Sequence, residues 1–178
     1  MARSDAPAPY LELLAGGAWW TVGSGVFDRG TGTVVLAAGL GVTGGLVTAV
    51  RRRSGPGPTL STAERNRLLR MLFVTVLLIA GVSAGLAYFD YAELAGPVAC
   101  ALVGALLLPL SSLLGARSTV LAGGALMLLG AAGALLALGS AGDLYPLGLV
   151  GLGAGVVLWV AGAHRTGLLD ELRGHVRG

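Results

Sequence analysis

The sequence predicts an all-α membrane protein, a polytopic bundle of six transmembrane helices arranged as three hairpins with both termini in the cytoplasm. Only 12% of the residues are charged and the mean hydropathy is +0.80, whereas about 25% of a soluble domain is charged. Long segments lack Asp, Glu, Lys, Arg and His, and the arginines gather in a few connections. Little chain remains outside these segments, so residues 1–178 are expected to form a single membrane domain.

The elements follow from these uncharged segments, because a helix needs about 20 mainly apolar residues to cross the hydrocarbon layer. The predicted spans are about 9–27, 31–50, 70–89, 95–115, 118–140 and 144–163. The first is extended back to Pro9, which places Glu12 one turn inside the membrane boundary, within reach of lipid headgroups or a partner arginine. A cleaved signal peptide is the alternative, but Asp5 and Glu12 oppose Arg3 there, whereas signal peptides begin with a positive region.

The arginines predict the orientation of these spans. Eleven of the twelve fall on one side, and only Arg29 falls on the other. The positive-inside rule therefore places both termini and the connection 51–69 in the cytoplasm of a cell whose inner (plasma) membrane holds the protein. Six arginines in and next to this connection are candidates for binding lipid headgroups or docking a partner: Arg51, Arg52, Arg53, Arg65, Arg67 and Arg70.

Local signals place several helix boundaries. Ser61 followed by Glu64 matches a capping box, so the third helix is expected to begin at Thr62, before its membrane span. Pro109 lies inside the fourth span and is expected to kink it. Apolar residues on one face of 166–178 predict an amphipathic C-terminal tail on the inner leaflet.

Glycine is abundant and its spacing points to helix packing. GxxxG pairs occur at Gly41/Gly45, Gly81/Gly85 and Gly151/Gly155, and such pairs let helices approach closely in lipid. They either pack inside the bundle or join a second copy or another membrane protein. Residues 15–23 and 122–130 share the pattern AGGxxxxxG, through ancestry or coincidence. Cys100, the one cysteine, is expected to be a small core residue.

The sequence offers few groups for chemistry. The predicted central layer lacks ionisable side chains, which argues against proton pumps, ion-coupled carriers and voltage sensors. Hydroxyl groups in the spans are expected to bond to carbonyls of the preceding turn. No metal-ligand spacing, nucleotide motif or catalytic triad pattern occurs, so no cofactor, metal or nucleic acid is expected.

Two weaker sets of candidates remain. Trp19, Trp20, Thr21 and Pro109 could line a pocket for an apolar ligand, although the indoles could instead fill gaps beside neighbouring glycines. At the outer face, Asp90 and Glu93 could act as general acid and base, or simply be solvated residues of a short connection.

One stretch carries a family resemblance. Val103, Gly104, Pro109 and Leu110 match a VGLHFLPLAR-type pattern, and residues 93–114 and 124–136 resemble the corresponding region of small bacterial multi-pass membrane proteins of unassigned function. Leu106 stands where that pattern has histidine, and Ser112 where it has arginine. The resemblance implies a multi-pass membrane protein without those two polar groups.

These features favour a scaffold or the membrane subunit of a larger assembly, with the lipid bilayer and either a second copy or another membrane protein as partners. The first alternative is a binding or transport module for an uncharged apolar small molecule. The second is an intramembrane enzyme using the outer acidic residues, and the lack of a buried catalytic set argues against it.

Overall fold

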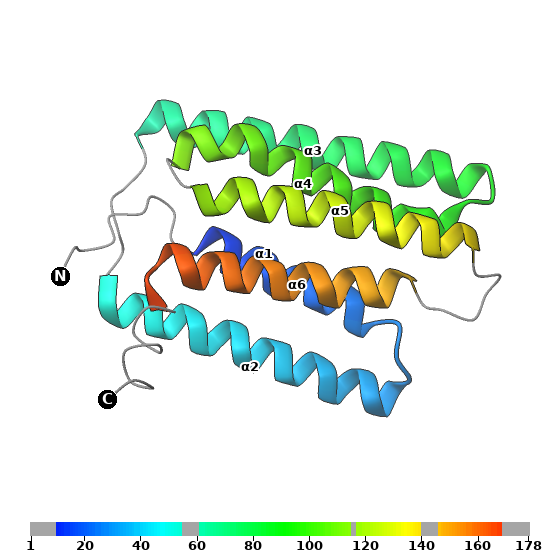
Figure 1. The fold of residues 1–178 in the computed structure, drawn as a ribbon, viewed down its shortest axis with the longest axis horizontal. Helices are drawn as coiled ribbons and strands as arrows, with labels where there is room; N and C mark the ends of the chain where they lie inside the picture. The colour runs from blue at the N-terminus through cyan, green and yellow to red at the C-terminus, as the bar shows by residue number, and fades with distance from the viewer. Residues whose placement is uncertain (1–9, 55–60, 115–116, 140–145, 169–178) are drawn as a thin grey trace.

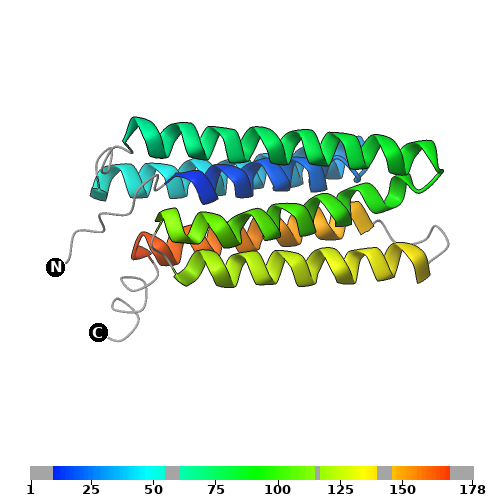
Figure 2. The same cartoon turned by 90° about the horizontal axis from the view of Figure 1, so that it is seen from above.

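The computed structural model describes residues 10–54, 61–114, 117–139 and 146–168, and in these ranges the protein is all-helical (Figure 1). The helices are α1 (Leu11–Ser24), α2 (Arg29–Ser54), α3 (Thr62–Tyr88), the short 3₁₀ helix η1 (Ala92–Leu94), α4 (Ala95–Leu114), α5 (Arg117–Gly139) and α6 (Pro146–Arg165). Their axes are roughly aligned along the long dimension of the bundle (Figure 2). The predicted all-α bundle is therefore confirmed.

Five of the described helices, α2 to α6, are long and apolar enough to cross a membrane. The first is not, because α1 has 14 residues and an α-helix of that length spans about 21 Å, less than the hydrocarbon thickness of about 30 Å. The expected span 9–27 thus contains a shorter helix that begins at Leu11 and ends at Ser24. The count of six spans remains a prediction.

Both ends of the connection 51–69 are helical, and its second half follows the predicted start of α3 at Thr62. Helix α2 continues to Ser54 and carries Arg51 to Arg53, while Arg65 and Arg67 already lie in α3. The physical reason is that arginine is a good helix former, so both helices extend past their apolar parts. Most of the expected tail 166–178 lies outside the described residues.

The cap predicted for α3 is present. The backbone N–H of Glu64 donates to the Ser61 hydroxyl oxygen (3.3 Å), and the backbone N–H of Ser61 donates to the Glu64 carboxylate (2.9 Å). At the other end, the N–H of Tyr91 donates to the carbonyl of Leu86 (2.8 Å), and that of Asp90 to Ala87 (3.3 Å). This is a Schellman motif with Asp90, at φ +61°, where glycine is usual.

The closest packing joins α1 to α6 and α4 to α5, each as an antiparallel pair. A Cβ atom added to Gly151 would lie 2.5 Å from the Cα of Gly23, and one added to Gly104 would lie 2.6 Å from the carbonyl oxygen of Gly123. The expected three hairpins therefore describe the chain connectivity, whereas the tightest contacts join the first helix to the last and the second hairpin to the third.

The shared AGGxxxxxG pattern explains both contacts. Its glycines recur seven residues apart, which places them on one face of a helix. Gly16 and Gly23 face α6, where added Cβ atoms would meet Trp159 and Leu152 at 2.6 Å. The equivalent Gly123 and Gly130 face α4 in the same way. The pattern is a close-packing device, whatever its ancestry.

Burial divides the bundle into two groups. Helices α1, α4, α5 and α6, called the inner helices below, supply most of the core, and α6 alone buries ten of its residues. Cys100 is fully buried there, as expected. Helices α2 and α3, called the flanking helices, lie at opposite edges of the bundle (Figure 1). One face of α2 packs on α1, while α3 rests on α4 and buries no residue.

The two ends of the bundle differ in charge. The end of α2 and the start of α3 carry exposed arginines, and α6 ends there at Arg165 (Figure 1). We call this the arginine end. At the opposite end, Asp28, Arg29, Asp90 and Glu93 are exposed.

Candidate functional site

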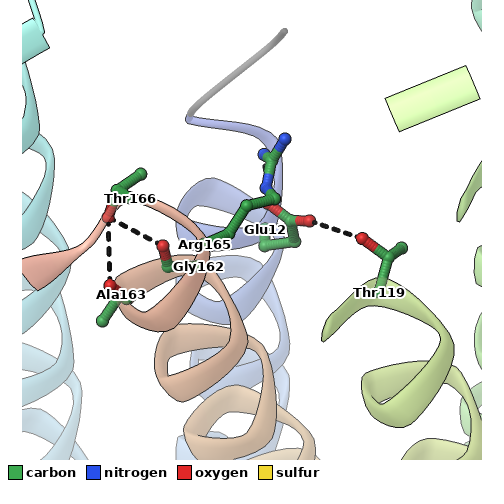
Figure 3. Close-up of polar contacts among 6 residues, drawn as sticks. All are labelled: Glu12, Thr119, Gly162, Ala163, Arg165 and Thr166. Carbon is green, nitrogen blue, oxygen red and sulfur yellow. Dashed lines mark hydrogen bonds and ion pairs between the residues drawn. The ribbon is translucent and has the colours of Figure 1, made fainter. Parts of the chain in front are cut away.

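A buried ion pair joins α1 and α6 at the arginine end (Figure 3). The guanidinium of Arg165 donates from Nη2 to Oε2 of Glu12, and their side chains are 3% and 1% exposed. The hydroxyl of Thr119, on the first turn of α5, donates to the other carboxylate oxygen at 3.4 Å. Three inner helices therefore meet at one carboxylate.

The positions of these residues suit their charges. Glu12 lies in the first turn of α1 and Arg165 in the last turn of α6, where the helix dipoles favour an acid and a base respectively. The hydroxyl of Thr166 donates to the carbonyls of Gly162 (2.8 Å) and Ala163 (3.2 Å), which completes the end of α6 (Figure 3).

This cluster holds helices together, and the described residues place no reacting group beside it. Burying a charge is costly unless a partner and hydrogen bonds compensate it, and Glu12 has both. The sequence predicted that Glu12 would find headgroups or an arginine, and the arginine interpretation is confirmed. It did not identify Arg165, and nothing in the pattern pointed to Thr119.

The tryptophan candidates lie in different environments. The ring of Trp20 lies 4.9 Å from that of Trp159, tilted by 32°, and its Nε1 donates to the carbonyl of Val35 at 2.7 Å. A Cβ atom added to Gly39 would lie 2.0 Å from Cδ1 of Trp20. Trp19 instead packs against the core of α4, α5 and α6. Trp20 therefore occupies space that a glycine leaves, which favours the packing interpretation.

The other two pocket candidates do not join the tryptophans. Thr21 is exposed and its hydroxyl donates to the carbonyl of Gly17 (2.9 Å), and Pro109 is exposed within a continuous α4. The same bonding to an earlier carbonyl occurs at Ser24, Thr43, Thr75 and Ser111, as expected for hydroxyls in apolar helices.

An open groove of about 450 Å³ lies between α5 and α6. Its wall consists of Ser118, Leu121, Ala122 and Ala125 from α5, and Val156, Val157, Val160, Ala161 and His164 from α6. Only Ser118 and His164 are polar, and both lie toward the arginine end. None of the site candidates predicted from the sequence lines this groove.

The charged candidates whose side chains the structure describes are all exposed. Asp90 and Glu93 are exposed beside η1, and the backbone role of Asp90 is to end α3. Arg51, Arg52, Arg65, Arg67 and Arg70 are exposed at the arginine end, and the backbone of Arg53 lies among them. Among the described residues, no group of three or more His, Cys, Asp or Glu side chains is placed to hold a metal ion.

Comparison with known proteins adds no relative: no family model, no curated protein and no solved structure matches this chain. The resemblance carried by Val103, Gly104, Pro109 and Leu110 therefore remains a prediction. The helices are apolar enough for a membrane protein.

Proposed function

We propose that this chain is a non-enzymatic scaffold or membrane subunit of a larger assembly in the bacterial inner membrane. It crosses the bilayer six times, with the arginine end in the cytoplasm. The charge difference between the two ends supports this orientation. The flanking helices α2 and α3 are the surfaces that bind another membrane-spanning helix.

The observation that carries this proposal is the contrast among the three GxxxG pairs. Gly151 and Gly155 are in backbone contact with α1, whereas Cβ atoms added to Gly41, Gly45, Gly81 or Gly85 would meet nothing within 4 Å. In lipid, helices associate through faces of small residues that allow close approach. The flanking helices thus carry the same packing motif as α6, but no described helix packs against it.

The outward face of α2 strengthens the argument. Its exposed residues are mostly small, with Val34, Leu40 and Val42 as the larger exceptions. The small ones include Thr33, Ala37, Ala38, Gly41, Gly44, Gly45 and Thr48. The exposed side of α5 instead presents Leu121, Leu128 and Leu135, which are 75%, 74% and 72% exposed. Leucine side chains suit contact with lipid tails, while small residues allow another helix to approach closely. Helix α3 also exposes Phe73 and Leu77, so for α3 the proposal rests on Gly81 and Gly85 alone.

A photocrosslinking residue placed on each kind of face tests this assignment in membranes. Leu77 on α3 is 56% exposed and lies one turn before Gly81, and Leu135 on α5 is the matched control. We expect adducts heavier than the 17.7 kDa chain from position 77 and none from position 135. If probes at position 77, at position 135 and on the exposed face of α2 all leave the protein uncrosslinked, the result would count against the assembly role.

A further inference from the structure

We propose that the exposed arginines of α2 and α3 bind the phosphate groups of anionic phospholipids in the leaflet at the arginine end. These residues, called the arginine surface below, are Arg51, Arg52, Arg65, Arg67 and Arg70. The proposal rests on the membrane-spanning part of the proposed function. It depends neither on assembly with another protein nor on which side of the membrane is cytoplasmic.

The length of α3 and the tyrosines at its far end place its arginines at the headgroup layer. Helix α3 has 27 residues and is about 40 Å long, about 10 Å longer than the hydrocarbon layer is thick. Tyr88 and Tyr91 are 83% and 50% exposed at its end, and tyrosine concentrates at the membrane interface. The surplus of about seven residues therefore lies at the start of α3, around Arg65 and Arg67.

Helix α2 reaches the same layer from the other edge of the bundle (Figure 1). It begins at Arg29 and has 26 residues, of which about 20 suffice to cross the hydrocarbon layer. Its last turn, with Arg51 and Arg52, therefore lies beyond that layer. Residues 55–60 join the two helices and can span at most about 25 Å, so both groups of arginines lie at one end of the protein.

The charge of the arginine surface is not cancelled by the described acids near it. Glu64 is exposed and therefore ionised at neutral pH, but it supplies one negative charge against five guanidinium groups. Glu12 is buried in its own ion pair. In the sequence, residues 1–9 carry one arginine and one acid, and residues 169–178 carry two of each. Their side chains thus add no net charge, and the surface stays positive.

A lipid leaflet is the partner that this arrangement fits. Phosphate accepts strong, charge-assisted hydrogen bonds from guanidinium groups, and basic residues beside a membrane span attract anionic headgroups. Because the arginines lie on helices at opposite edges of the bundle (Figure 1), a leaflet surrounding the protein presents phosphates to both groups at once. Arg70 lies nearest the hydrocarbon layer, and the apolar stem of its side chain lets the guanidinium reach the same phosphates.

Electron spin resonance of spin-labelled phosphatidylglycerol and phosphatidylcholine tests the surface, with the purified full-length protein in phosphatidylcholine bilayers. The fraction of each labelled lipid that the protein immobilises gives their relative affinity. We expect phosphatidylglycerol to be preferred about fivefold, the factor that one arginine near the membrane surface contributes. In about 1 M salt the preference should nearly vanish, because exposed charges are then screened within about 3 Å.

Substitutions in α3 test which residues carry the preference. Arg65→Gln with Arg67→Gln removes two exposed charges and leaves the other arginines to orient the protein, and it should reduce the preference to about twofold. Arg65→Lys with Arg67→Lys is the matched control and should keep most of it, because the charges remain. The salt dependence of the wild type remains decisive if a variant fails to fold.

Three results would overturn the proposal: equal immobilisation of the two lipids by the wild type, a preference that salt does not reduce, or the same loss in the glutamine and lysine variants. If the glutamine variant keeps its lipid preference but loses the adducts expected from position 77, the arginines bind a partner protein instead. A wild type that immobilises neither lipid would overturn the membrane-spanning assignment as well.

Discussion

Helices α6 and α3 are both long and apolar and each carries a GxxxG pair, yet they have opposite environments. Half of the residues of α6 are buried, and none of α3. The glycines of α6 bring it into backbone contact with α1, while a Cβ atom added to Gly81 of α3 would meet no atom of the described residues within 4 Å. The GxxxG motif is therefore the same in both helices, but only in α6 does a described helix pack against it.

Substitutions in the inner and flanking helices should differ in their cost to the free energy of unfolding, and we expect the largest difference at the buried ion pair. Arg165→Met leaves the Glu12 carboxylate buried without its cation, which should cost about 3–5 kcal/mol of unfolding free energy. Arg67→Met, at an exposed arginine of α3, should change it by less than about 0.5 kcal/mol. Equilibrium unfolding in bicelles or mixed micelles measures both values.

The double substitution Glu12→Leu with Arg165→Met should recover much of the loss, because no uncompensated charge remains. If the double variant is as unstable as Arg165→Met alone, packing around Arg165 rather than charge pairing holds the helices together.

The next largest difference between α6 and α3 is expected from glycine substitutions. Gly151→Ala forces its Cβ atom against the Gly23 backbone and should destabilise the fold by about 1–3 kcal/mol. Gly81→Ala meets no atom and should leave stability unchanged or raise it by up to about 1 kcal/mol, through helix propensity. Equal losses from the two variants in the same unfolding assay would show that both faces are packed.

A smaller and local effect is expected at the start of α3. Ser61→Ala removes the hydroxyl that accepts from the Glu64 N–H and should weaken the cap by about 1 kcal/mol. Because α3 is held by few buried contacts, the loss should appear as faster hydrogen exchange in residues 62–66. Protection in α6 should stay the same, and a parallel loss there would mean that α3 supports the core.

The smallest effect concerns the end of α3. Asp90 adopts a left-handed conformation that glycine adopts at less cost, so Asp90→Gly should stabilise the protein by roughly 0.5 kcal/mol. Asp90→Asn should be neutral, since asparagine also tolerates this conformation. A thermal unfolding series that shows Asp90→Gly to be destabilising would point to a role for the carboxylate itself.

The sequence predicted what depends on local chemistry. The all-α class, the cap at Ser61, the burial of Cys100 and the carbonyl bonding of Thr43 and Thr75 all follow from residue type and spacing. The helical state of Arg51 to Arg53 was missed, because an apolar window marks where a membrane span ends and not where a helix ends.

Tertiary partners could not be predicted in this way. The pairing of α1 with α6 brings Glu12 into contact with Arg165, although the two residues lie near opposite ends of the sequence. No local sequence pattern predicts a contact between residues so far apart in the chain. The same holds for Trp20, whose neighbours Trp159, Val35 and Gly39 come from α6 and α2. The groove between α5 and α6 depends on Ala122 and Ala125 facing α6. Their spacing along the sequence does not predict which neighbouring helix they face.

The mass of the complex extracted from membranes in polymer nanodiscs tests the central claim most directly. For the wild type we expect a particle heavier than one 17.7 kDa chain, and for Gly81→Leu with Gly41→Leu a shift to the monomer with unchanged unfolding. A wild-type protein found only as a monomer would contradict the claim that the flanking helices are binding surfaces.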